Sequence, residues 1–178
     1  SSVNIKNISR DILNKYDWGI PVRYRDIVNL NKIFNPPLFE FHLSSKDLEY
    51  DLKRIAHEDL KRKKIIVHSI EQFHDGFIFD LASDSEDIIK ESFKRMNKIM
   101  KHCNHIYKLF CPNNKIQIIL NCGGFSKDGF LKPENISIKE EKLLNNLFKL
   151  KNKYQNYEFL PQTMPPFPWH QGGRTYHN

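Results

Sequence analysis

Polar side chains stand where apolar runs of this sequence end, and their types suit proton transfer and the binding of hydroxyl groups. His42 follows LFEF, His68 follows IIV, Asn121 follows IQIIL, and Gln162 follows the run that closes with Leu160. Imidazole exchanges a proton near neutral pH or binds a metal through a ring nitrogen. Side-chain amides donate to and accept from hydroxyl groups. The pattern predicts a site to which four separate segments each contribute one side chain.

The stretch from 158 to 178 carries a second group of such side chains. Trp169, His170 and Arg174 lie here in a segment that contains four prolines. Proline fixes its own φ and lacks an N–H, so we expect a stiff loop that walls a pocket rather than a helix. The alternative is a proline-rich linker or a tail lying against the surface.

Loop residues after two of the apolar runs extend the candidate site. Glu71, three residues beyond His68, is a candidate base or metal ligand, and histidine with carboxylate suits Zn, Mn, Co or Mg. Gly123 and Gly124 follow Asn121, and glycine permits positive φ and close approach of the backbone to a ligand. Arg174, beside a glycine pair, is a candidate for binding a phosphate or carboxylate.

Several other chemistries find no support in the sequence. It contains no P-loop, dinucleotide fingerprint or GxSxG elbow, and no cysteine stands beside a plausible base. Three cysteines without a CxxC pair argue against a disulfide framework and a structural zinc site. The net charge of +7 comes mostly from scattered lysines, which does not favour a nucleic-acid partner.

The candidate residues can meet only if the chain supplies parallel strands. Strands are expected at 38–43, 65–68, 116–120 and 157–160, and residues 18–22 read as a first strand or a strand-to-helix turn. Connections too long for hairpins separate them, so an α/β fold with a parallel sheet is predicted. The carboxyl ends of parallel strands meet at one edge, which is where sites form.

Helical spacing and capping patterns predict the connecting elements. A helix is expected over 26–34, and a second one, capped by Ser44 or Ser45, carries Leu48, Leu52 and Ile55. Capping boxes at Ser83 and Ser137 predict the starts of two longer helices, the first running to Phe110. There is no signal-peptide pattern and no apolar run of about twenty residues, so a cytoplasmic protein without a membrane span is expected.

Six short motifs together resemble the xylose-isomerase-like TIM barrels, a superfamily of sugar-phosphate isomerases and epimerases and of type IV apurinic endonucleases. The resemblance lies in IIVHSIEQF and LNCGGFS, and a subgroup found as a C-terminal domain of nonulosonic-acid (sialic-acid-type) synthases is similar in DWGIPVRYRD, FEFHLSSKDLE, DLAS and LPQTMPPFPWHQGGRTYHN. It implies a (β/α)8 barrel over residues 17–178, with residues 1–16 as a linker or N-terminal helix. Eight strands need about 250 residues, so an incomplete barrel, truncated at its C-terminal end in a fragment of a longer chain, is expected.

The resemblance also implies an activity and a site. It implies a sugar or sugar-phosphate isomerase or epimerase with a divalent metal on His68, while the superfamily's glutamate ligand falls on Pro161 or Gln162, neither of which is anionic. A non-catalytic module that binds a sugar or docks on a fused or partner synthase domain is the alternative, and an apurinic endonuclease is the third. The expected catalytic residues are His68 and Glu71; the expected substrate-binding residues are His42, Asn121, Gly123, Gly124, Gln162, Trp169, His170 and Arg174.

Overall fold

Five strands form one parallel sheet in the computed structural model, which describes residues 18–127, 129–164, 173–176 and 178. Every pair of neighbouring strands in this sheet is parallel. The α/β class with a parallel sheet is therefore confirmed, and the doubtful first segment is a strand. The five strands are β1 (Gly19–Val22), β2 (Leu38–His42), β3 (Lys64–His68), β4 (Gln117–Asn121) and β6 (Glu158–Gln162).

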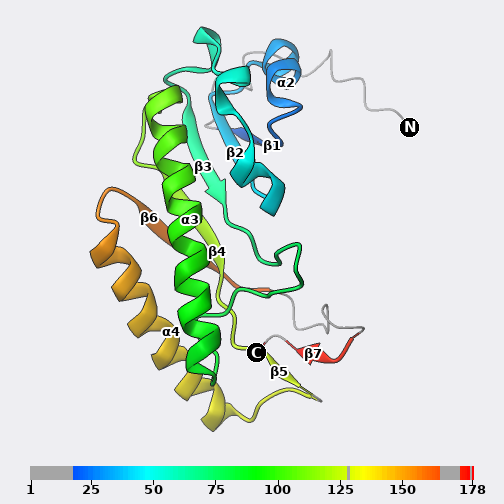
Figure 1. Ribbon diagram of the computed structural model, residues 1–178, viewed down its shortest axis with the longest axis vertical. Helices are drawn as coiled ribbons and strands as arrows, with labels where there is room; N and C mark the ends of the chain where they lie inside the picture. Colours follow the sequence, from blue (N-terminus) through cyan, green and yellow to red (C-terminus); the bar gives the residue numbers. More distant parts are fainter. Residues whose placement is uncertain (1–17, 128, 165–172, 177) are drawn as a thin grey trace.

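The strands lie in the sheet in the order in which they occur in the chain, β1-β2-β3-β4-β6. A doubly wound sheet reverses its strand order at one point, and no reversal occurs among the described strands. Right-handed crossovers between strands laid down in one direction place their helices on one face. Figure 1 shows α3 (Glu86–Phe110) and α4 (Pro133–Lys153) side by side in front of the sheet.

Among the described residues, the core packs against one face of the sheet. Alternate residues of the three central strands are at most 1% exposed and form one cluster with the buried side of α3; they are Phe39, Phe41, Ile65, Val67, Ile118 and Leu120. On the opposite face, His68 and Ile119 are only half-buried, and Leu160 is 38% exposed. Since parallel sheets normally bury both faces, the second face is an unusually open surface for this fold class.

The segment after β2 departs from the predicted helix. The first predicted helix is confirmed as α2 (Ile27–Phe34), but the expected helix after Ser44 is wrong. Three short 3-10 turns take its place, at Ser45–Glu49, Leu52–Ile55 and Glu58–Leu60. The Asp47 carboxylate accepts from the Ser44 N–H and hydroxyl, both at 2.6 Å, and Asp51 accepts from the Lys53 N–H at 3.1 Å. These local side-chain bonds cap the starts of the first two turns, and such bonds compete with continuous helical hydrogen bonding.

The two long helices exist, but both capping boxes are misplaced. Helix α3 begins after Ser85, and the Ser83 hydroxyl instead accepts from the Ser85 N–H at 3.2 Å. Helix α4 begins at Pro133, where a fixed φ and a missing N–H are well tolerated. Ser137 therefore lies inside the helix, with its hydroxyl donating to the Pro133 carbonyl at 3.4 Å.

A small antiparallel pair, which the sequence did not reveal, lies beyond β4. Strand β5 (Ser126–Lys127) pairs with β7 (Thr175–Tyr176), so the end of the chain returns to the loop after β4 (Figure 1). The Asn178 amide donates to the Gly124 carbonyl at 2.7 Å and reinforces this return. No helix within the described ranges is both long and apolar enough to cross a bilayer.

Candidate functional site

The carboxyl ends of the strands bring four predicted side chains to one edge of the sheet. His42 lies opposite His68 in the β2–β3 register, and Asn121 lies opposite Gln162 in the β4–β6 register. Paired residues of parallel strands point to the same side, and alternation along each strand places all four on the open face. The predicted convergence of these strand ends is confirmed; the chemical roles of the residues stay predictions. We call His42, His68, Asn121 and Gln162 the strand-end cluster.

The two histidines of the cluster are in direct contact. Their rings stack with centroids 4.2 Å apart and planes 23° from parallel. His68 Nδ1 lies 3.1 Å from the Ser69 carbonyl oxygen, which can only accept. His68 Nε2 lies 2.9 Å from Oε1 of Gln162, also an acceptor, in a side chain that reaches across β4 from the outer strand. Both ring nitrogens of His68 are thereby held, and the ring orientation is fixed.

Nearby charge and partial burial favour the neutral form of His42. Partial burial lowers the pKa of His42 first, and the neighbouring His68 and Arg23 lower this pKa further, against a smaller opposing effect of Glu40. A histidine with a lowered pKa is an uncharged proton acceptor at neutral pH. The His42 ring can therefore serve as a base at the carboxyl end of β2, where it is exposed to solvent.

Arg23 is a neighbour of the cluster that sequence reasoning missed. Its guanidinium donates to the His42 carbonyl and lies 3.6 Å from the Asp47 carboxylate. It follows directly on Val22, the last residue of β1. The signal that identified the other strand ends, a polar residue after a strand, was therefore present here as well.

Two buried polar atoms, one in Asn121 and one in Ser69, have no hydrogen-bond partner within the described part of the chain. They are Oδ1 of Asn121, a residue 3% exposed, and Oγ of Ser69, a residue 4% exposed. Buried polar atoms are nearly always hydrogen-bonded, because leaving one unpaired costs free energy. A bound polar ligand or an ordered water would satisfy them. Ser69 was also missed, although it directly follows His68.

The glycine pair after Asn121 has the predicted backbone conformation but approaches a different group. Gly123 and Gly124 both have φ of +78°. The buried Asp80 carboxylate accepts from the Gly124 N–H at 2.8 Å and the Phe125 N–H at 3.4 Å. A Cβ on Gly123 would lie 2.2 Å from Asp80 Oδ1. The close approach that glycine permits here is to this side chain, and burial raises the pKa of Asp80.

The remaining predicted residues are not at the ends of the main strands. Glu71 lies half-buried in a bend after β3, where its carbonyl accepts from the Phe79 N–H at 2.8 Å. Arg174 is exposed in the turn before β7, beside the small antiparallel pair. Trp169 and His170 lie outside the described residues. The cluster thus consists of two imidazoles and two amides, which suits hydroxyl and carbonyl groups.

The described residues do not fit the metal site that the resemblance implies. No three His, Cys, Asp or Glu side chains of the described ranges are grouped so as to hold an ion. His68 has Gln162 at Nε2 and Ser69 at Nδ1, so a metal on this ring would require Gln162 to move away.

No protein-family model, no curated protein and no solved structure matches this chain.

Proposed function

We propose that the strand-end cluster binds a sugar or sugar phosphate, and that the chain is an isomerase- or epimerase-like domain. Asn121 Oδ1 carries this proposal, because it is a buried acceptor without a hydrogen-bond partner among the described residues and lies at the carboxyl ends of the strands, as the two imidazoles do. A sugar hydroxyl donates to such an acceptor, and Gln162 offers a second amide beside it. Two amides and two imidazoles bind hydroxyl groups without any need for a charged ligand.

The proposed reaction is the transfer of a proton between carbons beside a carbonyl. Neutral His42 accepts the proton from the carbon next to the carbonyl, and the electron pair of the broken C–H bond moves onto the carbonyl oxygen. In an isomerase, His42 then returns the proton to the former carbonyl carbon, while the proton of the hydroxyl group on the neighbouring carbon passes to the former carbonyl oxygen. In an epimerase, the intermediate turns its other face toward His42 before the proton returns to the same carbon. The lowered pKa of His42 favours this return.

The finer fold proposal is an incomplete (β/α)8 barrel. Two features support it: the strand order runs without a reversal, and the candidate residues lie at the carboxyl ends of the strands. Active sites of barrel enzymes are built at this end of the strands. In this reading the open face of the sheet is the inner wall of the barrel.

Calorimetric and NMR titrations with aldoses, ketoses, sugar acids and sugar phosphates test the binding proposal. We expect His42→Ala and Asn121→Ala to weaken binding at least tenfold, while His105→Ala, on the exposed side of α3, binds as the wild type does. Each titration is repeated with EDTA and with Zn, Mn, Co or Mg, so that a metal requirement shows itself directly. Failure of every sugar class to bind would overturn the proposal.

A non-catalytic sugar-binding module is the second candidate, and Gln162 favours it. This neutral amide occupies the strand end where the resemblance leads us to expect a glutamate ligand. Exchange of the substrate C–H proton with D2O separates the two candidates. Exchange that His42→Ala abolishes supports the isomerase or epimerase, whereas binding without exchange assigns the chain to the binding class.

A further inference from the structure

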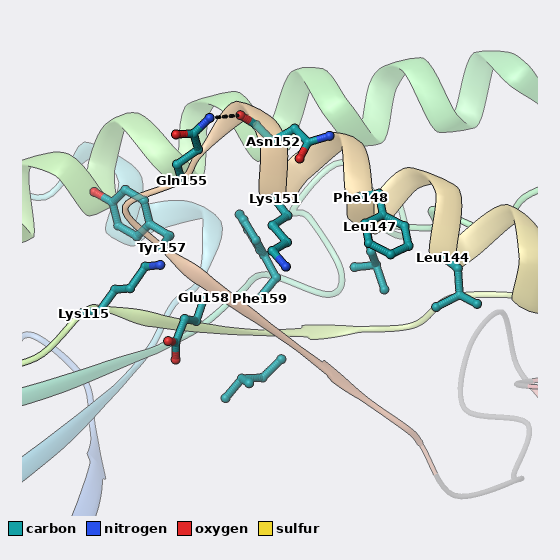
Figure 2. Close-up of a pocket in the computed structure, with 11 residues that line it drawn as sticks. Lys115, Leu144, Leu147, Phe148, Lys151, Asn152, Gln155, Tyr157, Glu158 and Phe159 are labelled. Carbon is teal, nitrogen blue, oxygen red and sulfur yellow. Dashed lines mark hydrogen bonds between the residues drawn. The ribbon is translucent and has the colours of Figure 1, made fainter.

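An apolar groove of about 730 Å³ lies between α4 and the outer strand β6, apart from the residues of the strand-end cluster. Figure 2 shows Leu144 and Leu147 pointing from α4 toward the strand, with Phe148 beside them and Phe159 on the opposite wall. Leu144 is 55% exposed and Phe148 is 58% exposed. In the described sheet, β6 pairs only with β4. The open edge of the sheet thus coincides with exposed apolar side chains.

The exposed side of α4 has the spacing of a helix–helix contact surface. Its residues alternate in steps of three and four, which is the repeat of a coiled-coil seam. All of them are exposed, although Leu144 and Phe148 at its centre are large and apolar. The seam consists of Ser137, Glu141, Leu144, Phe148 and Lys151.

This seam is complementary to itself in the antiparallel direction. Two antiparallel copies of α4 can be related by a two-fold axis at the level of Asn146. Each residue then faces the residue of the second copy that lies the same number of positions from Asn146 on its other side. Leu144 and Phe148 both lie two positions from Asn146, so Leu144 of each copy packs on Phe148 of the second copy. Glu141 and Lys151 both stand five positions away, so a carboxylate meets an ammonium group on each side of the axis. Apolar residues thus meet apolar residues, and opposite charges meet.

We infer that a second copy of this chain covers the groove, and that the dimer forms through antiparallel packing of the two α4 helices. The charges select this occupant, because an arbitrary apolar partner would not require acid and base at equal distances from one point. Dimerisation removes Leu144 and Phe148 from water and shields the open edge at β6. A further β/α unit or an unrelated protein on this surface is the competing outcome.

Sedimentation velocity over a range of protein concentrations tests the inference with the chain as it is. We expect a concentration-dependent dimer for the wild type and a monomer for Phe148→Glu, because a buried carboxylate at the seam has no partner. Ile33→Glu is the matched control, since Ile33 is an apolar residue of α2 that is 70% exposed. It should dimerise as the wild type does, and circular dichroism should show both variants folded.

Charge reversal separates the two-fold geometry from general apolar association. Glu141→Lys and Lys151→Glu each place like charges opposite each other twice per dimer, and we expect each to raise the dissociation constant about tenfold. Mixing the two variants restores complementary pairs, so the mixture should form a heterodimer with near wild-type affinity. A wild type that stays monomeric, or a dimer insensitive to Phe148→Glu, would overturn the inference.

Discussion

At the scale of single residues, Gly123 is the position least able to accept a side chain. Its φ of +78° strains any other residue, and a Cβ would lie 2.2 Å from the Asp80 carboxylate. We expect Gly123→Ala to lower the free energy of unfolding by about 2 to 4 kcal/mol, from strain and clash together. Gly76→Ala is the matched control, with φ of +82° and no atom within 4 Å of the added Cβ. It should cost about 1 kcal/mol, from backbone strain alone.

Urea denaturation of both variants measures the difference. Equal losses of stability would mean that Asp80 moves away from the new methyl group, and that the bond between Asp80 and the Gly124 N–H contributes little.

Ser69 has a buried hydroxyl without a hydrogen-bond partner among the described residues. Removing this hydroxyl should cost nothing and gain up to about 1 kcal/mol. We therefore expect Ser69→Ala to unfold at an equal or slightly higher urea concentration. A variant that is clearly less stable would show that the hydroxyl already has a partner, such as an ordered water.

The candidate residues fall into those the sequence could reveal and those it could not. His42, His68, Asn121 and Gln162 each end an apolar run, so their meeting follows from local sequence and parallel pairing alone. Asp80 is different, because its role arises from a contact with Gly124, 44 residues further along the chain. The stacking of the two histidines likewise depends on strand register, which no local pattern fixes.

At the scale of elements, Arg95 anchors the loop between β3 and α3. Its guanidinium makes two hydrogen bonds to the Asp75 carboxylate, at 2.9 and 2.7 Å, and lies over the rings of Phe73 and Phe77 at 4.6 and 4.3 Å. These bonds lower the pKa of Asp75. A lysine cannot reproduce a two-pronged bond and ring stacking together.

We expect both Arg95→Lys and Arg95→Met to loosen this loop without unfolding α3. Hydrogen exchange at the Gly76, Phe77 and Phe79 amides, which bond within the loop or to Glu71, should become at least tenfold faster. Lys94→Met, which removes an exposed pair with Glu91, is the control and should leave these amides unchanged. Unchanged exchange in the Arg95 variants would mean that the apolar contacts of Phe73 and Phe79 hold the loop by themselves.

The accuracy of the element predictions follows from how local each signal is. The β-branched run of β3 and the long apolar stripe of α3 are repeated signals, and the sequence predicts the position of β3 and the end of α3 at Phe110 correctly. The 3-10 turns after β2 depend on single side-chain bonds at Asp47 and Asp51, which helical spacing does not report. The pair of β5 and β7 joins segments about fifty residues apart and is only two residues long in each strand.

At the scale of the whole molecule, a buried histidine makes stability depend on pH. His102 is 5% exposed and lies 2.8 Å from the Tyr24 hydroxyl. Burial chiefly, with nearby His105 and against the attraction of Asp47, lowers the pKa of His102 from 6.5 to about 4. The unfolded chain therefore binds a proton at a higher pH than the folded chain does. The contribution of His102 to the free energy of unfolding is fully present above pH 6.5 and is lost as the pH falls toward about 4.

We expect the urea midpoint of the wild type to fall between pH 6.5 and 4.5, and the fall to be smaller in His102→Gln. Glutamine keeps a hydrogen-bonding group for Tyr24 but does not titrate. His42, whose pKa is also lowered, contributes in the same direction in both proteins, so the difference between them isolates His102. Parallel pH curves would contradict this assignment.

The strand order has a consequence for how the chain acquires its structure during synthesis. In the five-stranded sheet, each strand is laid beside the strand of that sheet made before it, so none of these five has to wait for a distant neighbour still inside the ribosome. A nascent chain can therefore extend its sheet one unit at a time from the amino-terminal side. The newest strand always presents unpaired backbone until the next one emerges, which makes each pause in translation a moment of exposure to mispairing.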